Sequence, residues 1–234
     1  MSLGGEMRQI DYPDRAEQAE GLAASVADTL RAGIAAEGRA SLALPGGTTP
    51  GLFLEALARQ ELDWAQVTVF PADERWVPAD HPRSNAALIR RHLLRDEAVM
   101  AKLIDLYDGE PTPQAAAPGL SAHLAPHLPL TALVVGMGDD LHTASLFPGA
   151  PGIVQALSPD APPLMAMEGP APEREPRVSL TLPVLQAAGG AHLLIVGDSK
   201  RAALARALSM PEGTDPAEAP ILGLLEHLTI HWAP

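Results

Sequence analysis

The predicted fold rests on residues 40–50, ASLALPGGTTP. The first five residues are a short, mostly apolar run, which is typical of a strand buried on both faces of a sheet. The glycines and prolines after it end the strand. Thr49 and Pro50 then suit the N-cap and first position of a helix. A strand that passes through a glycine-rich turn into a helix is the repeating unit of parallel α/β sheets.

The same alternation recurs along the chain. A first helix is predicted from a cap at Asp14 to a stop at Gly38, because apolar residues recur at every fourth position between them. Further strands are predicted at residues 67–70, 131–135, 191–196 and 228–232, and further helices at 52–57, 86–94 and 199–208. We therefore predict an α/β fold with a doubly wound, mostly parallel sheet flanked by helices, in one domain over residues 1–234.

Two stretches rich in proline and alanine, residues 108–119 and 148–176, do not follow this rhythm. We interpret both as long surface connections with room for a small extra helix or hairpin. Residues 1–6 are interpreted as a disordered or foreign N-terminal extension and are left out of the fold prediction.

Composition excludes several classes of protein. The chain has 234 residues, 47% of them apolar, with no cysteine and a formal net charge of −13. Disulfides, thiolate metal sites and a cysteine nucleophile are therefore excluded. The acidic balance argues against binding to nucleic acid or to anionic membranes. There is no apolar run of about 20 residues and no signal-peptide pattern, so we predict a cytoplasmic protein.

Four polar segments follow predicted strands, at residues 45–50, 71–85, 136–149 and 197–200. Ligands of open α/β sheets bind beyond the carboxyl ends of the strands. We therefore expect these four segments to lie around one site.

The first segment has the residues of an anion site. Gly46 and Gly47 allow backbone N–H groups to approach an anion, Thr48 and Thr49 add hydroxyl donors, and the following helix adds a partial positive charge. It is not a Walker loop, because no Gly-Lys-Ser/Thr follows. A plain strand–helix turn remains the alternative.

Charged residues follow or precede the other strands. Asp73 and Glu74 lie beside Arg75 and could orient a substrate or tune a base; a surface salt bridge is the alternative. Two cations lie near predicted strand ends: Arg177, just before a further predicted strand that begins at Val178, and Lys200, after Gly197. Arg177 could hold an anion with two hydrogen bonds and Lys200 with a point charge, or both could be solvated.

Residues 136–149, GMGDDLHTASLFPG, carry the most chemistry. His142 suits general acid–base catalysis near neutral pH, and Asp140 lies two residues before it. Leu141 stands where a dinucleotide fingerprint needs its third glycine, and Ser145 is not in a Gly-x-Ser-x-Gly elbow. We predict no metal site, because the other closely spaced histidines, His123 and His127, have a proline between them and no third ligand nearby.

Five segments, taken in their order along the chain, resemble the 6-phosphogluconolactonase family: residues 44–50, 73–85, 136–149, 177–185 and 197–200. That family belongs to a wider fold group that includes glucosamine-6-phosphate deaminase. Two departures stand out: Pro45 replaces a small polar residue, and Leu141 replaces a glycine before the histidine. If position 141 needs a positive φ, leucine costs roughly 1 kcal/mol or more there.

The resemblance implies hydrolysis of 6-phospho-D-glucono-1,5-lactone to 6-phosphogluconate, without metal or cofactor. It implies that His142 is the general base, that Asp140 orients it, and that Asp73 contacts water or hydroxyls. The 6-phosphate would be held by Gly46, Gly47, Thr48, Thr49, Arg177 and Lys200, and Arg75 would serve either the phosphate or the acidic cluster. The expected partner is a small phosphorylated sugar lactone, and the expected state is a monomer or small homo-oligomer. A sugar-phosphate isomerase or deaminase and a non-catalytic sugar-phosphate-binding domain remain alternatives on the same fold.

Overall fold

The computed structural model describes residues 8–169 and 175–234. The predicted extension at residues 1–6 therefore lies outside the described residues, as does part of the predicted connection at 148–176.

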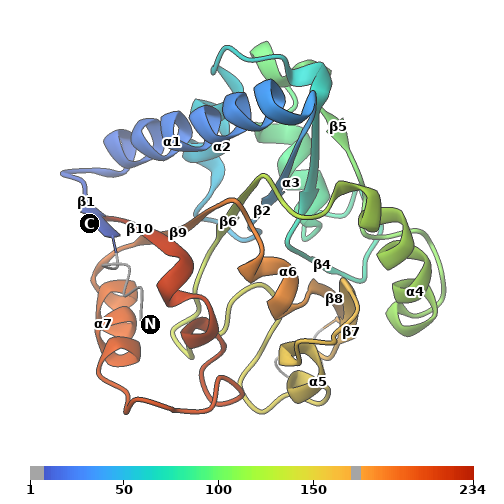
Figure 1. The fold of residues 1–234 in the computed structure, drawn as a ribbon, viewed down its shortest axis with the longest axis vertical. Helices are drawn as coiled ribbons and strands as arrows, with labels where there is room; N and C mark the ends of the chain where they lie inside the picture. The colour runs from blue at the N-terminus through green and yellow to red at the C-terminus, as the bar shows by residue number, and fades with distance from the viewer. Residues whose placement is uncertain (1–7, 170–174) are drawn as a thin grey trace.

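A parallel sheet organises the described residues, and this confirms the predicted fold class (Figure 1). Its strand order is β1-β10-β9-β6-β2-β3-β5, and every pair of neighbours is parallel. The chain winds from β2 through β3 to β5 in one direction and through β6, β9 and β10 in the other. The switch point, where α/β sheets bind ligands, therefore lies between β2 and β6. The bounds are β1 Arg8–Asp11, β2 Ala40–Leu44, β3 Val67–Pro71, β5 Lys102–Leu103, β6 Ala132–Val135, β9 Gly190–Val196 and β10 Leu228–Ala233.

Helices cover both faces of this sheet, and each face has its own apolar core. On one face lie α1 (Arg15–Glu37), α2 (Gly51–Ala58) and α3 (Asn85–His92), and on the other α4 (Pro113–Leu124), α5 (Ile153–Leu157), α6 (Leu182–Gln186) and α7 (Asp198–Leu208). Strand β2 contributes Leu42 and Leu44 to the first core and Ala43 to the second. Burial on both faces explains why its sequence is apolar without alternation.

The helix ends test the predicted caps. Asp14 caps α1 by accepting hydrogen bonds from the backbone N–H groups of Ala16 and Glu17, and Gly38 ends it in the left-handed conformation, as predicted. Ser84 caps α3. The prediction for Thr49 is wrong: α2 begins at Gly51, Pro50 occupies the N-cap position, and no side chain caps the helix. Short 3₁₀ helices cover Trp64–Gln66, Asp96–Met100, Ala125–His127, Pro220–Gly223 and Leu225–His227.

A small antiparallel sheet, absent from the prediction, lies beside the main one (Figure 1). Its order is β4 (Asp73–Arg75), β8 (Arg177–Leu180) and β7 (Leu164–Met167). In its register Arg75 lies opposite Arg177. The sheet therefore brings charged residues about 100 positions apart in sequence to one place.

The predicted connection at residues 108–119 carries an extra helix, as the prediction allowed, but this helix, α4, has a buried face and is not only a surface connection. Pro113 lies in the first turn, where its missing N–H needs no partner, and Thr112 caps the helix. The buried face of α4 packs against β7. Packing thus outweighs the effect of Pro118 inside the helix. The connection at 148–176 carries α5 and β7, in agreement with the predicted extra element.

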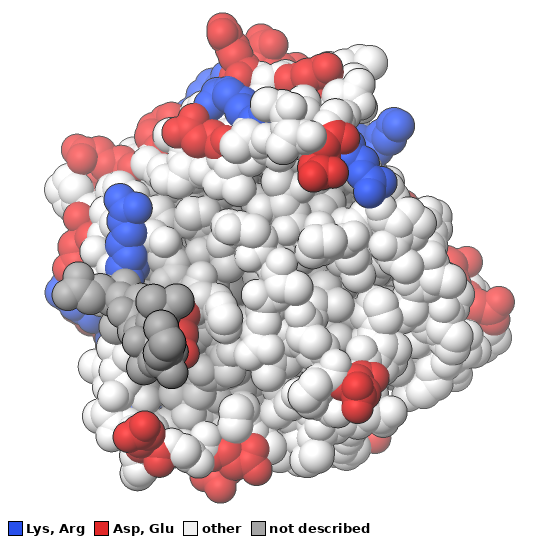
Figure 2. Space-filling view, in the orientation of Figure 1, with Lys and Arg blue, Asp and Glu red and all other residues white. Residues whose placement is uncertain are grey.

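The surface shows acidic and basic side chains interspersed. On the described part of the face in Figure 2 they lie mainly around the rim, and the centre carries neither. None of the described helices is long and apolar enough to cross a membrane.

Candidate active site

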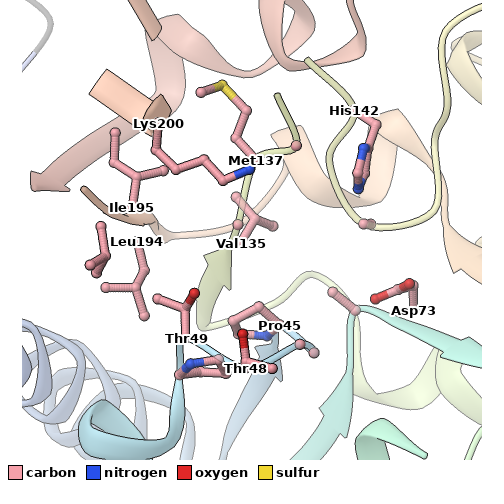
Figure 3. Close-up of a pocket in the computed structure, with 18 of the residues that line it drawn as sticks. Pro45, Thr48, Thr49, Asp73, Val135, Met137, His142, Leu194, Ile195 and Lys200 are labelled. Atoms are coloured by element: carbon pink, nitrogen blue, oxygen red, sulfur yellow. The ribbon is translucent and has the colours of Figure 1, made fainter. Parts of the chain in front are cut away.

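The four predicted segments do converge, at the switch point between β2 and β6. They line a cavity of about 290 Å³, close to the lower end of the range of roughly 300–1,000 Å³ for small-molecule pockets. In Figure 3, Thr48 and Thr49 lie on one wall, Lys200 on another, and His142 and Asp73 across from Lys200. The predicted site residues that line it are Gly46, Gly47, Thr48, Thr49, Asp73, Arg75, His142, Arg177 and Lys200. Asp140 is not a lining residue and contacts the site through His142.

The turn after β2 needs its two glycines for different reasons. Gly47 has φ +91, a left-handed conformation that strains other residues. Gly46 has no such φ, but a Cβ there would overlap the carboxamide of Asn85. Asn85 can therefore pack closely against Gly46. The turn lines the cavity next to the N-terminus of α2.

Asn85 organises the segment after β3. Its Nδ2 donates to the backbone oxygen of Asp73 at 2.6 Å and to Asp73 Oδ1 at 3.2 Å. Its Oδ1 accepts from Arg75 Nη1 at 2.6 Å, and Arg75 Nη1 also donates to the carbonyl of Arg83 at 2.8 Å. The guanidinium of Arg75 is therefore held in place beside the cavity.

Glu74 does not join this group, contrary to the predicted carboxylate pair. It is 1% exposed and its carboxylate accepts from Asn85 N and Ala86 N, both at 2.8 Å, and from Ser84 Oγ at 2.9 Å. Burial raises the pKa of Glu74, and these hydrogen bonds oppose that shift. Glu74 anchors the N-terminus of α3, so Asp73 alone faces the cavity.

Asp73 belongs to a buried polar cluster. Ser145 Oγ donates to Asp73 Oδ2 at 2.5 Å, and Arg177 Nη1 lies 3.6 Å from the same oxygen. The guanidinium of Arg177 also lies over the ring of Phe147, 5.4 Å from its centroid. Burial lowers the pKa of Arg177, and the charge of Asp73 opposes this shift. Ser145 is fully buried and does not line the cavity, which agrees with its rejection as a nucleophile.

His142 is oriented by Asp140. The two side chains meet at 2.5 Å between His142 Nδ1 and Asp140 Oδ1. The hydrogen bond from His142 holds the pKa of Asp140 below its usual range. An ionised carboxylate can only accept, so Nδ1 carries the proton and Nε2 is left as a base. Gly138 makes room for the pair, because a Cβ there would overlap both side chains.

The backbone of the loop that carries His142 is strained at two positions. Leu141 has φ +69 and Ala144 has φ +49. Position 141 therefore has the positive φ at which a leucine is expected to be costly. The Leu141 side chain is 4% exposed in the core, and its carbonyl accepts from Ile221 N at 3.1 Å. Packing and this hydrogen bond therefore fix the residue next to the histidine.

Lys200, in the first turn of α7, is paired with an acid from the same loop. Its Nζ lies 3.0 Å from Asp139 Oδ1, which also accepts from Ser199 Oγ at 3.0 Å. These contacts hold the pKa of Asp139 below its usual range. Lys200 thus lines the cavity, and Asp139 holds its side-chain nitrogen in place.

Two contributions escaped the sequence analysis. Asn85 was included only as part of the segments 71–85 and 73–85, and Ser145 was considered only as a nucleophile. Both hold other site residues through contacts distant in sequence. Among residues 8–169 and 175–234, no group of three histidine, aspartate or glutamate side chains is arranged to hold a metal ion.

Comparison with known proteins identifies the family of the chain. The family model described as glucosamine-6-phosphate isomerases/6-phosphogluconolactonase matches residues 13–232. The chain belongs to this family. It is 47% identical over 224 residues to the 6-phosphogluconolactonase of Pseudomonas aeruginosa, covering 94% of this chain and 92% of that protein. It is 44% identical to that of Rhizobium meliloti, covering 92% and 94%. The crystal structure of a 6-phosphogluconolactonase from Shewanella baltica superposes with a TM-score of 0.92 at 30% identity over the full length of both chains.

Proposed function

We propose that the protein hydrolyses 6-phospho-D-glucono-1,5-lactone to 6-phospho-D-gluconate, the second step of the oxidative pentose phosphate route. The observation that carries the proposal is the Asp140–His142 pair at one side of a cavity whose other side is the glycine-rich turn after β2. The relatives at 47% and 44% identity, both named 6-phosphogluconolactonase, support the same activity.

The phosphate is proposed to bind between the turn after β2 and Lys200. The backbone N–H groups and hydroxyls of Gly46, Gly47, Thr48 and Thr49 supply donors, and the N-terminus of α2 adds partial positive charge. Lys200 supplies a full charge, for which the phosphate competes with Asp139. Anchoring the 6-phosphate here fixes the other end of the sugar near His142.

The chemical step needs an activated water and a proton for the leaving oxygen. His142 Nε2 removes a proton from water, whose oxygen attacks the lactone carbonyl at C1. The tetrahedral oxyanion collapses, the bond from C1 to the ring oxygen breaks, and the imidazolium returns its proton to that oxygen. One water is thus added across one ester bond. Asp140 holds the ring and stabilises the imidazolium between the two transfers.

Arg177 is placed near the reacting end of the cavity. Phe147 contacts the ring of His142 at 4.5 Å between centroids, and the guanidinium of Arg177 lies over the same phenyl ring. A cation there supports negative charge developing on the carbonyl oxygen. The alternative role, a direct contact with the phosphate, predicts a change in KM alone, so the split between kcat and KM separates the two.

The test is hydrolysis of freshly generated lactone, followed by NMR against a control without enzyme, because the lactone also opens spontaneously. We expect acceleration proportional to protein, and a loss of roughly 10²–10⁴-fold in kcat for His142→Ala. His123→Ala, at an exposed histidine outside the cavity, is the matched control and should keep full activity. A His142→Ala protein with kcat within a few-fold of wild type would exclude His142 as the base.

The family description also names glucosamine-6-phosphate isomerases, so the same protein should be incubated with glucosamine 6-phosphate. We expect no release of ammonia. Ammonia release without lactone hydrolysis would assign the deaminase reaction instead. Binding of 6-phosphogluconate with neither activity would assign a sugar-phosphate-binding domain.

A further inference from the structure

A second cavity lies at the opposite edge of the main sheet, where β2, β3 and β6 begin. Its volume is about 640 Å³, against about 290 Å³ for the candidate active site, and it falls within the range of roughly 300–1,000 Å³ for small-molecule pockets. Its walls come from α1, from the segments that lead into β3 and β6, and from the start of β5. No motif in the sequence pointed to it.

Three hydroxyl groups at this cavity have protons to donate. Ser41 and Thr68 are neighbours in the register of β2 and β3, and they are only 5% and 8% exposed. Ser41 Oγ accepts from Thr131 N at 3.1 Å, and Thr131 Oγ1 accepts from Ser41 N at 3.0 Å. Within the described part of the chain, none of the three hydroxyls donates to a protein acceptor. Hydroxyls at the wall of a cavity that have no protein acceptor are free to donate to a ligand inside it.

The same cavity is lined by the cationic side chains of Arg39 and Lys102 and by the imidazole of His127. Among residues 8–169 and 175–234, neither Arg39 nor Lys102 forms a salt bridge; Arg39 donates to the carbonyl of Pro126 at 2.9 Å. Burial lowers the pKa of His127, and the charges of Arg39 and Lys102 lower it further. Glu37 is the acidic lining residue. In a chain of net charge −13, two cations against one carboxylate give this cavity a local excess of positive charge.

We propose that this cavity binds a multivalent oxyanion of the phosphate class. The three hydroxyls donate to its oxygens, and the side chains of Arg39 and Lys102 supply the opposing charge. Hydroxyl donors together with fixed cations favour an oxyanion over a simple halide, because directed hydrogen bonds add to the charge interaction. The site lies beyond the opposite ends of the strands from the candidate active site, so it is independent of the proposed lactonase activity.

The test is a titration of the ¹⁵N-labelled protein with pyrophosphate, beside sodium chloride at the same ionic strength. We expect saturable chemical-shift changes at the backbone amides of Ser41 and Thr68 with pyrophosphate and none with sodium chloride. The double variant Arg39→Gln/Lys102→Gln should weaken this binding by about tenfold or more. Lys200→Ala should leave these shifts unchanged while removing any shift of the Gly47 amide, which reports on the active site.

A pair of variants tests the hydroxyls without altering charge. Thr68→Val removes the hydroxyl donor while keeping the shape of the side chain, and it should weaken binding on the order of fivefold. Thr29→Val is the matched control, because Thr29 lines the same cavity but its hydroxyl already donates to Ser25 O at 3.0 Å. Equal effects of the two variants would overturn the role of Thr68. Shifts no larger than those with sodium chloride, or confined to the Gly47 region, would overturn the site and leave the proposed function intact.

Discussion

Replacing Leu141 by glycine and by alanine separates two opposing contributions to stability. The backbone of Leu141 has φ +69, which costs a residue with a Cβ about 1–2 kcal/mol. Its side chain is only 4% exposed, and removing a buried leucine side chain to alanine costs roughly 2–5 kcal/mol. We therefore expect packing to outweigh strain, so that both variants are less stable than the wild type.

The glycine variant should be more stable than the alanine variant, which is the reverse of the usual order. Leu141→Ala keeps the strain and loses the packing, with an expected loss of about 3 kcal/mol. Leu141→Gly also loses the packing but relieves the strain, and glycine is about 1 kcal/mol more stable than alanine where φ is positive. We expect a loss of about 2 kcal/mol for Leu141→Gly, measured by urea unfolding from the midpoint and the m-value.

Leu146 provides the matched control. It is fully buried in the same loop, but its φ is not positive. There glycine should be less stable than alanine by roughly 0.5–1 kcal/mol. If alanine equals or exceeds glycine at position 141 as well, the left-handed backbone is not the conformation in solution. If Leu141→Gly is more stable than the wild type, strain outweighs packing and the reasoning is refuted.

Three further predictions concern the active site and acid stability. Asp140→Asn should lower kcat by roughly 10²-fold with little change in KM, because an amide can hold His142 in the wrong tautomer; kcat within twofold of wild type would contradict this. Lys200→Ala should raise KM by about tenfold; an unchanged KM would remove Lys200 from the phosphate site. Burial lowers the pKa of His192 to about 4 and that of His231 to about 3. The unfolded chain binds protons that the folded chain excludes, so the free energy of unfolding should fall below about pH 6.5 by up to ~1.4 kcal/mol per pH unit for each histidine. Urea unfolding at a series of pH values should show a shallower fall for His192→Gln, and equal slopes would exclude His192.

The main sheet could be predicted because its signals are local. The run at residues 40–44 is apolar throughout because both of its faces are buried, and Asp14 and Gly38 mark the ends of a helix through their own backbone preferences. The small sheet could not, because β4 and β8 are short, carry charged residues and pair across about 100 residues. The prediction of a single domain stays a prediction.

The residues that line the cavity could be named from the sequence, but apart from Asp140 beside His142 their partners could not. The turn after β2 and the region of His142 are contiguous motifs, so their presence in one cavity followed from the direction of the strands. The separation of Asp73 from Glu74 depends on where α3 begins, because Glu74 binds the N-terminus of that helix. Similarly, the role of Ser145 depends on its contact with Asp73, 72 positions away.

The close approach of Gly46 to Asn85 has an evolutionary consequence. Any larger residue at position 46 needs a smaller one at position 85, yet Asn85 also fixes Arg75 and Asp73. A lineage that changes position 46 first loses the shape of the turn, and one that changes position 85 first loses the support of two charged residues. The two positions can therefore be exchanged only through an impaired intermediate, so we expect them to vary together or not at all. Among the residues that the structure describes, Gly47 has no such partner, and its own backbone conformation is its constraint.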